Sequence, residues 1–196
     1  MPELKNVALP ATLLCLVLMT VLVFNGGGAT EDNIRLMIRM TAASSMVLFS
    51  LTFSASSLQH LFNDGRWRPV MQARRRLGLS FALSHTVHLL AIIALVEVVF
   101  GGDYSQLGDI FGGSVIYLFI FAMAATSNNA SVKFLGIKNW TRLHKIGSYL
   151  IWVGLFSSYF GNALETGAMH YWLYSALGVG LLLLRIWAFW DKRLRV

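Results

Sequence analysis

Three histidines lie in or beside apolar stretches where ionisable side chains are rare. His85 and His88 occur in "RRRLGLSFALSHTVHLL", and His144 occurs in "NWTRLHKIGSYL". On a helix, the i, i+3 spacing puts His85 and His88 on one face, about 12 and 17 Å beyond the preceding arginines. Buried polar residues at such depth in a membrane are costly and indicate function by default. The alternative is a pair of neutral imidazoles hydrogen-bonded between helices.

A heme fits these residue types better than a bare metal ion. His144 follows Asn139, which we expect to cap the start of its helix. A porphyrin between the two histidine-bearing helices takes an imidazole from each, as bundle cofactors do. Iron with two imidazoles suits electron transfer, and the protein sets its potential through axial ligands and burial. Zinc fits less well, since no Cys, Asp or Glu lies near these histidines in the sequence.

The elements that position these histidines are predicted to be membrane helices. The chain is 56% hydrophobic and 13% charged, against a usual charged fraction of about 25%. Its apolar residues fall in six blocks near the roughly 20 residues that a membrane helix needs, and lone strands would leave backbone groups unpaired in lipid. We expect an all-α integral membrane protein that forms one membrane domain over 1–196, a six-transmembrane-helix bundle. The six helices are predicted at approximately 7–24, 37–62, 77–100, 110–126, 145–160 and 169–190.

The first block is expected to remain as a membrane helix. Its apolar run is longer than a signal-peptide core, and "NGGGATEDN" after it is a poor cleavage site. Cys15, the single cysteine, lies within this block. A disulfide framework is therefore excluded, and we interpret the thiol as a packing residue.

The distribution of charge predicts the orientation. Of the 16 Lys and Arg residues, only Arg35 and Arg39 fall outside the N-terminal segment, the second and fourth connections, and the C-terminal tail. The positive-inside rule then places both termini and these two connections in the cytoplasm. The net charge of +7 is explained by topology and by contact with anionic membrane lipid, and needs no nucleic acid.

No soluble cofactor domain is visible in the sequence. The longest polar connection, between the fourth and fifth helices, has about 20 residues, which is too short for such a domain. Neither GxGxxG nor GxxxxGK[ST] occurs. Any redox role therefore needs a separate electron donor, either a flavin reductase or a quinol.

Two stretches together carry a resemblance to a known family. "RRRLGLSFALSHTVHLL" and "AMAATSNNASVKFLGIKNWTRLHKIGSYL" resemble the ferric-reductase-like transmembrane family, over roughly residues 40–165. Within this family, the two stretches resemble the heme-binding membrane subunit of the bacterial periplasmic methionine-sulfoxide reductase system. The resemblance implies a ligand histidine at His88 and a second heme-associated histidine at His144. The "TS" pair at the end of helix four and the "WxxLHxxxY" pattern around His144 match as well.

One position departs from the family pattern. The family carries a further histidine 13 residues after the first one on helix five, where this chain has Ser157. Two pairings then remain open. In the first, one heme is held by His88 and His144. In the second, His60 and His144 form a pair near the cytoplasmic side, and His85 or His88 either binds another iron or hydrogen-bonds a propionate. We expect one b-type heme rather than two.

The arginine cluster at 74–76 has two interpretations. Arg74, Arg75 and Arg76 either mark the cytoplasmic face and contact lipid headgroups, or bind heme propionates or the phosphate of FMN through bidentate hydrogen bonds.

The sequence thus predicts a b-type membrane cytochrome of the bacterial inner (plasma) membrane. We expect it to pass electrons from a cytoplasmic reductase or quinol toward a periplasmic redox partner, as a subunit of an oxidoreductase. The alternative is a heme-free membrane scaffold or assembly subunit that retains the fold.

Overall fold

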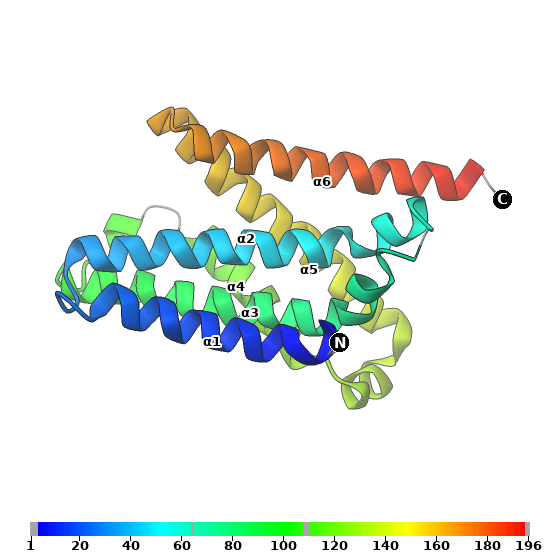
Figure 1. Ribbon diagram of the computed structural model, residues 1–196, viewed down its shortest axis with the longest axis horizontal. Coiled ribbons are helices and arrows are strands. Elements are labelled where there is room, and N and C mark those ends of the chain that lie inside the picture. Colours follow the sequence, from blue (N-terminus) through cyan, green and yellow to red (C-terminus); the bar gives the residue numbers. More distant parts are fainter. Residues whose placement is uncertain (1–3, 64, 108–109, 195–196) are drawn as a thin grey trace.

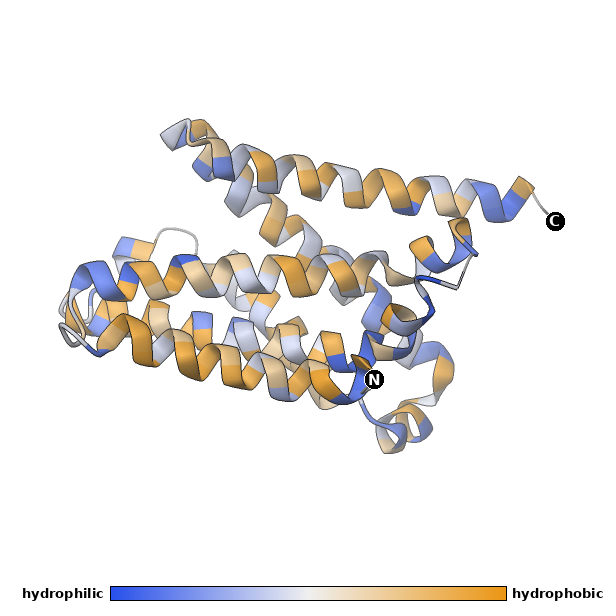
Figure 2. Cartoon of the chain, viewed as in Figure 1, coloured by the Kyte–Doolittle hydropathy of each residue, from blue (hydrophilic) through white to orange (hydrophobic). Residues whose placement is uncertain are grey.

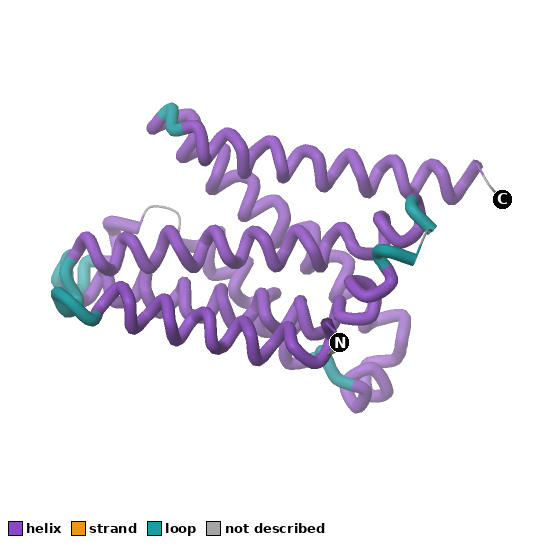
Figure 3. The backbone as a smooth tube through the Cα atoms, in the orientation of Figure 1, coloured by secondary structure: helices purple, strands orange, loops and turns teal. Residues whose placement is uncertain are grey.

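The computed structural model describes residues 4–63, 65–107 and 110–194, and within these ranges every regular element is a helix. The all-α prediction is confirmed. In chain order the elements are α1 (Leu4–Phe24), α2 (Glu31–Leu61), α3 (Arg68–Val98), the short 3₁₀ helix η1 (Tyr104–Leu107), α4 (Ile110–Ala125), α5 (Asn129–Thr166) and α6 (Met169–Leu194). Short loops join them (Figure 3).

The helices form a bundle built on the antiparallel pair α2 and α3. α1 packs on α3, α6 packs on α2 and α5, and α4 packs on α5. Figure 1 shows α5 crossing behind α2 to reach α6. The start of α1, the end of α6 and the α2–α3 and α4–α5 connections gather toward one end of the bundle, on the right in Figure 1. This end, called the basic end below, carries the two basic connections named above.

Four helices are long and apolar enough to cross a membrane: α1, α2, α3 and α6. The pair α4 and α5, bent by 117°, passes the same test only as one unit, which makes five spans. α4 has 16 residues, about 24 Å of helix, which is shorter than a hydrocarbon core of about 30 Å. The chain is therefore a multi-pass membrane protein, and its six predicted helices supply four or five candidate spans by length and composition.

Large apolar side chains cover the outside of the bundle. α1 and α6 expose many of them, among them Leu14, Leu22, Leu183 and Trp187. Figure 2 shows hydrophobic residues along the lengths of the helices and hydrophilic ones concentrated at their ends. Exposed apolar surface on this scale marks contact with lipid or with another protein.

Three helices begin well before their predicted starts: α2 at Glu31 rather than 37, α3 at Arg68 rather than 77, and α5 at Asn129 rather than 145. α3 begins at Arg68 with Pro69 in its first turn, a position that suits proline, so the arginines at 74–76 belong to the helix and not to the connection before it. α5 begins at Asn129, and its cap is Asn128, whose side chain accepts a hydrogen bond from the Ser131 amide. The prediction that Asn139 caps this helix was wrong.

The helical backbone of α5 is interrupted at Gly136, before Asn139. Gly136 has a φ of 72°, which interrupts the helical backbone and is a conformation that glycine adopts without strain. Asn139 follows inside the resumed helix and donates its side-chain amide to the Leu135 carbonyl at 3.1 Å. The bend lets the first turns of α5 lie across the basic end before the helix enters the bundle.

Glycines allow α4 to lie close to α5. A Cβ atom added at Gly147 would overlap the Met123 side chain, and one added at Gly154 would overlap Ile116. Small residues at such contacts are typical of membrane helices, where close approach of backbones provides packing energy. This contact fixes the position of α4 against α5.

Candidate functional site

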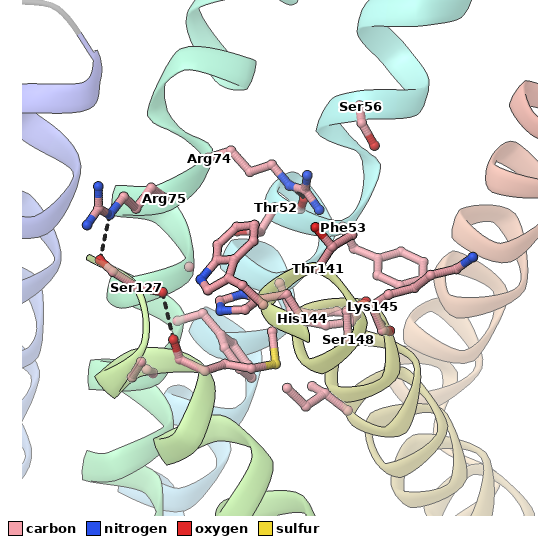
Figure 4. Close-up of a pocket in the computed structure, with 18 of the residues that line it drawn as sticks. Thr52, Phe53, Ser56, Arg74, Arg75, Ser127, Thr141, His144, Lys145 and Ser148 are labelled. Carbon is pink, nitrogen blue, oxygen red and sulfur yellow. Dashed lines mark hydrogen bonds between the residues drawn. The ribbon is translucent and has the colours of Figure 1, made fainter. Parts of the chain in front are cut away.

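A cavity of about 660 Å³ lies at the basic end of the bundle, between α2, α3, α4, α5 and α6. Its volume is within the range of small-molecule and cofactor sites. Apolar side chains make most of its wall, among them Phe49, Phe53, Phe81, Ile120 and Met123, and its polar groups include Arg74, Arg75, His144, Lys145 and Arg185. Figure 4 shows His144 among the labelled lining residues, with Arg74, Phe53 and Lys145 nearby.

His144 is oriented by contacts with α4 and with its own helix. Its Nε2 lies 3.1 Å from the Thr126 hydroxyl oxygen, which itself donates to the Ala122 carbonyl at 2.7 Å. The imidazole therefore donates from Nε2 and keeps its lone pair on Nδ1. The ring stacks on Trp140 with centroids 4.2 Å apart, and the Trp140 indole donates to the Thr126 carbonyl at 2.9 Å.

His88 lies deeper along α3 and does not line the cavity. Its Nδ1 is 3.1 Å from the Ile38 carbonyl oxygen and 3.1 Å from the Thr41 hydroxyl. A carbonyl only accepts, so Nδ1 carries the proton and Nε2 carries the lone pair. This arrangement, with one ring nitrogen donating to a backbone carbonyl, is typical of histidines that bind metal through the other nitrogen.

His85 stands between His88 and the cavity wall in a column of rings. Its centroid is 5.0 Å from that of His88 and 5.3 Å from that of Phe81, and Phe81 lines the cavity. Tyr117 of α4 stacks on it as well, at 5.1 Å. The imidazole is buried, and within the described residues its Nδ1 has no hydrogen-bond partner.

His60 is engaged elsewhere at the basic end. Its Nε2 lies 2.9 Å from a carboxylate oxygen of Asp191, and the neighbouring Phe62 packs edge-on against Trp187. These contacts join the end of α2 to α6. His60 does not line the cavity that holds His144, so the structure does not bring these two predicted partners together there.

The three neighbouring arginines have different surroundings. Arg74 lines the cavity and donates from Nε to the Thr52 carbonyl at 3.2 Å. Arg75 donates to the Ser127 carbonyl and, at 2.9 Å, to Asn129, so it joins α3 to the α4–α5 turn (Figure 4). Arg76 is exposed and outside the cavity lining.

Ser157, the position where the family carries a histidine, is exposed on α5. Its hydroxyl donates to the Val153 carbonyl of the same helix. The residue contributes nothing to the cavity lining.

Arg185 is a site residue that the sequence reasoning missed. The charge distribution grouped it with the C-terminal basic tail, although it lies within the predicted helix at 169–190, and in the structure it is on α6 and lines the cavity. The available signal was its setting in "LLLLRIWAFW", because an ionisable residue inside an apolar run usually faces the bundle interior.

A bare metal ion has no ready site in the described part of the chain, where no three His, Cys, Asp or Glu side chains gather as ligands. The cavity instead offers one imidazole nitrogen, several cationic groups and a largely apolar wall. This set suits a large apolar ligand with acidic substituents.

The fold and the cavity thus define a multi-pass, all-α membrane protein with a cofactor-sized site at its basic end. No family model and no solved structure matches the chain. Comparison with curated proteins confirms the resemblance to the MsrQ type of subunit. The protein-methionine-sulfoxide reductase heme-binding subunit MsrQ of Polaromonas naphthalenivorans is 29% identical over 126 residues, 62% of this chain and 58% of that protein. The MsrQ of Ralstonia nicotianae is 27% identical over 171 residues, 83% of this chain and 77% of that protein.

Proposed function

We propose that this chain is a heme-binding membrane subunit that transfers electrons. The observation that carries the proposal is the cofactor-sized cavity around His144, in a chain similar to two proteins named as heme-binding subunits. The cavity residues fit a heme in three respects. His144 keeps a free nitrogen lone pair, the wall is apolar, and cationic groups are available for propionates.

A bound heme would supply one-electron iron chemistry, with a potential that the protein tunes. His144 would be the iron ligand within the cavity. Trp140 and Thr126 hold the orientation of its ring. Phe49, Phe53 and Phe81 would exclude water from the ligand.

We propose His88 as the second iron ligand of a single b-type heme. The hydrogen bonds to its Nδ1 leave Nε2 for a metal. Since Phe81 and His85 lie between His88 and the cavity in the ring column, ligation by both His88 and His144 requires these two rings to move.

For the topology, we propose six membrane crossings with both termini in the cytoplasm of a bacterium and the protein in its inner membrane. The gathering of both helical termini and both basic connections at one end supports this orientation. The donor would be a cytoplasmic reductase or quinol, and FMN, bound through its phosphate, is a candidate cofactor beside heme. The acceptor would be a periplasmic partner such as a methionine-sulfoxide reductase catalytic subunit.

The second candidate function is a heme-free scaffold or assembly subunit. Two observations favour it: the exposed Ser157 at the expected ligand position and the single histidine in the cavity.

An absorption spectrum of the purified protein, oxidised and then reduced with dithionite, separates the two functions. The cytochrome predicts a Soret band with sharp α and β bands after reduction. A flat visible spectrum from protein expressed with ample heme supply would contradict it and support the scaffold.

A further inference from the structure

Arg185 is a cationic side chain placed inside the apolar part of α6. Its guanidinium group lies over the Phe53 ring, 4.1 Å from the centroid, and 4.9 Å from the centroid of Tyr149. The nearest backbone acceptor is the Phe53 carbonyl, at 3.5 Å from Nη1. This distance is at the outer limit of a hydrogen bond. Arg185 also interacts with the Tyr149 side chain through a hydrogen bond, and a guanidinium group with five N–H donors still has donors left after these two contacts.

Arg74 brings a second cation to the same place from α3. It donates to the Thr52 carbonyl, the neighbour in α2 of the Phe53 carbonyl that Arg185 approaches. Both arginines line the cavity, so two cationic side chains share its wall. No carboxylate of the described residues forms an ion pair with either one.

Two adjacent cations without an acid are unfavourable in an apolar setting, because each loses hydration and neither gains a counter-charge. The neighbouring arginines do not offer an alternative anion site in the cavity. Arg75 is bound to Ser127 and Asn129, and Arg76 is exposed outside it.

We propose that Arg74 and Arg185 together bind the acidic group of the ligand in this cavity, a carboxylate or phosphate carried by an apolar ring system. The guanidinium fork matches either oxyanion, and the rings of Phe49, Phe53 and Phe81 provide the apolar contact surface. The inference rests on the proposed function only in requiring that such a ligand occupies the cavity.

The test compares ligands that differ only in the acidic group, using the full-length purified protein freed of cofactor. Heme is compared with heme dimethyl ester, and FMN with riboflavin, by equilibrium titration. An ionic hydrogen-bond pair contributes enough for wild type to prefer the acidic form of its ligand by about tenfold. The heme pair and the FMN pair distinguish a carboxylate from a phosphate as the bound group.

The variants are Arg185→Gln and Arg74→Gln, with Arg193→Gln as the matched control. Arg193 is also on α6 and also stacks on an aromatic ring, that of Phe189 at 4.5 Å, but it is exposed and outside the cavity. We expect the preference for the acidic form to fall toward unity in both cavity variants and to persist in the control. Arg185→Lys, which keeps the charge without the planar fork, is expected to retain part of the preference and serves if Arg185→Gln does not fold.

Three results would overturn or redirect the account. A wild-type protein that binds heme and its diester equally, and FMN and riboflavin equally, contradicts the anion site while the proposed heme function stands. An undiminished preference in both cavity variants also contradicts it. Failure of wild type to bind heme at all contradicts the proposed function, and the anion site is then decided by the FMN and riboflavin pair alone.

Discussion

The two ends of α3 place their chemistry in different settings. At the basic end, Arg74 borders an open cavity opposite His144, and the groups there have unused donors or lone pairs. Farther along, His88 lies against α2, where Thr41 and Ile38 engage its Nδ1 and the Ser44 and Ser84 hydroxyls meet at 2.7 Å.

This difference separates two uses of a membrane histidine. The polar contacts around His88 engage only its Nδ1, so α2 holds the orientation of the ring without any ligand, while Nε2 keeps its lone pair. His144 has one hydrogen bond and a cavity beside it, as a ligand-binding residue requires. Variants in the surroundings of His144 and of His88 are therefore expected to have different effects.

The largest effect is expected from His144→Ala. Among the described residues, the His144 side chain is the only imidazole that lines the cavity. Loss of a residue that only supports a metal ligand lowers metal affinity about 10–100-fold. Loss of the ligand itself is therefore expected to lower heme content at least about tenfold. Heme per protein in the purified variant is the measurement, with the exposed His170→Ala as the control. A wild-type heme content in His144→Ala would contradict the distinction between the surroundings of His144 and those of His88.

The next effect tests the packing that shapes the cavity. Gly147→Val forces a side chain against Met123, which also lines the cavity, and overpacking of this kind costs about 1–3 kcal/mol. Gly161→Val is the matched control, because a Cβ at Gly161 meets nothing within 4 Å. Thermal unfolding should show a lower midpoint, with less bound cofactor, only for Gly147→Val.

A smaller effect is expected at Thr41, the residue whose hydroxyl contacts His88. Thr41→Val removes the contact with His88 and the hydrogen bond that the hydroxyl donates to the Met37 carbonyl, and a buried hydrogen bond contributes about 1 kcal/mol. If His88 ligates iron, the variant will also shift the heme midpoint potential, and Thr41→Ser will restore it. An unchanged potential beside an altered melting temperature would leave His88 a structural residue only.

The smallest effect is expected for His60→Ala. The variant breaks a partly exposed ion pair with Asp191, and such pairs contribute about 1 kcal/mol or less. Heme content should stay at the wild-type level. A loss comparable to that of His144→Ala would instead support a pairing of His60 with His144.

The sequence predicted the positions of the helices better than it predicted the site. Apolar length and the distribution of Lys and Arg follow directly from the solvent properties of lipid, and they located all six long helices within a few residues at most ends. The break at Gly136 and the start of α5 at Asn129 were missed, because Asn128 and Asn139 are equally good caps on local chemistry.

The site depended on information that the sequence does not carry locally. His60 and Asp191 are 131 residues apart, so their ion pair appears only after α2 and α6 pack together. Arg185 lies inside the helix predicted at 169–190, but the distribution of charge grouped it with the basic tail, and the packing of α6 is needed to show that it lines the cavity. The i, i+3 rule correctly placed His85 and His88 on one face, but it gave no sign that Phe81 and His85 separate His88 from the cavity.

The central claim is that one heme binds in the cavity around His144. Its most direct test is the heme-to-protein ratio of the purified wild-type chain, determined from the pyridine hemochrome spectrum and an independent protein assay. The account predicts about one b-type heme per chain. A ratio near zero in protein produced with sufficient heme would contradict the claim.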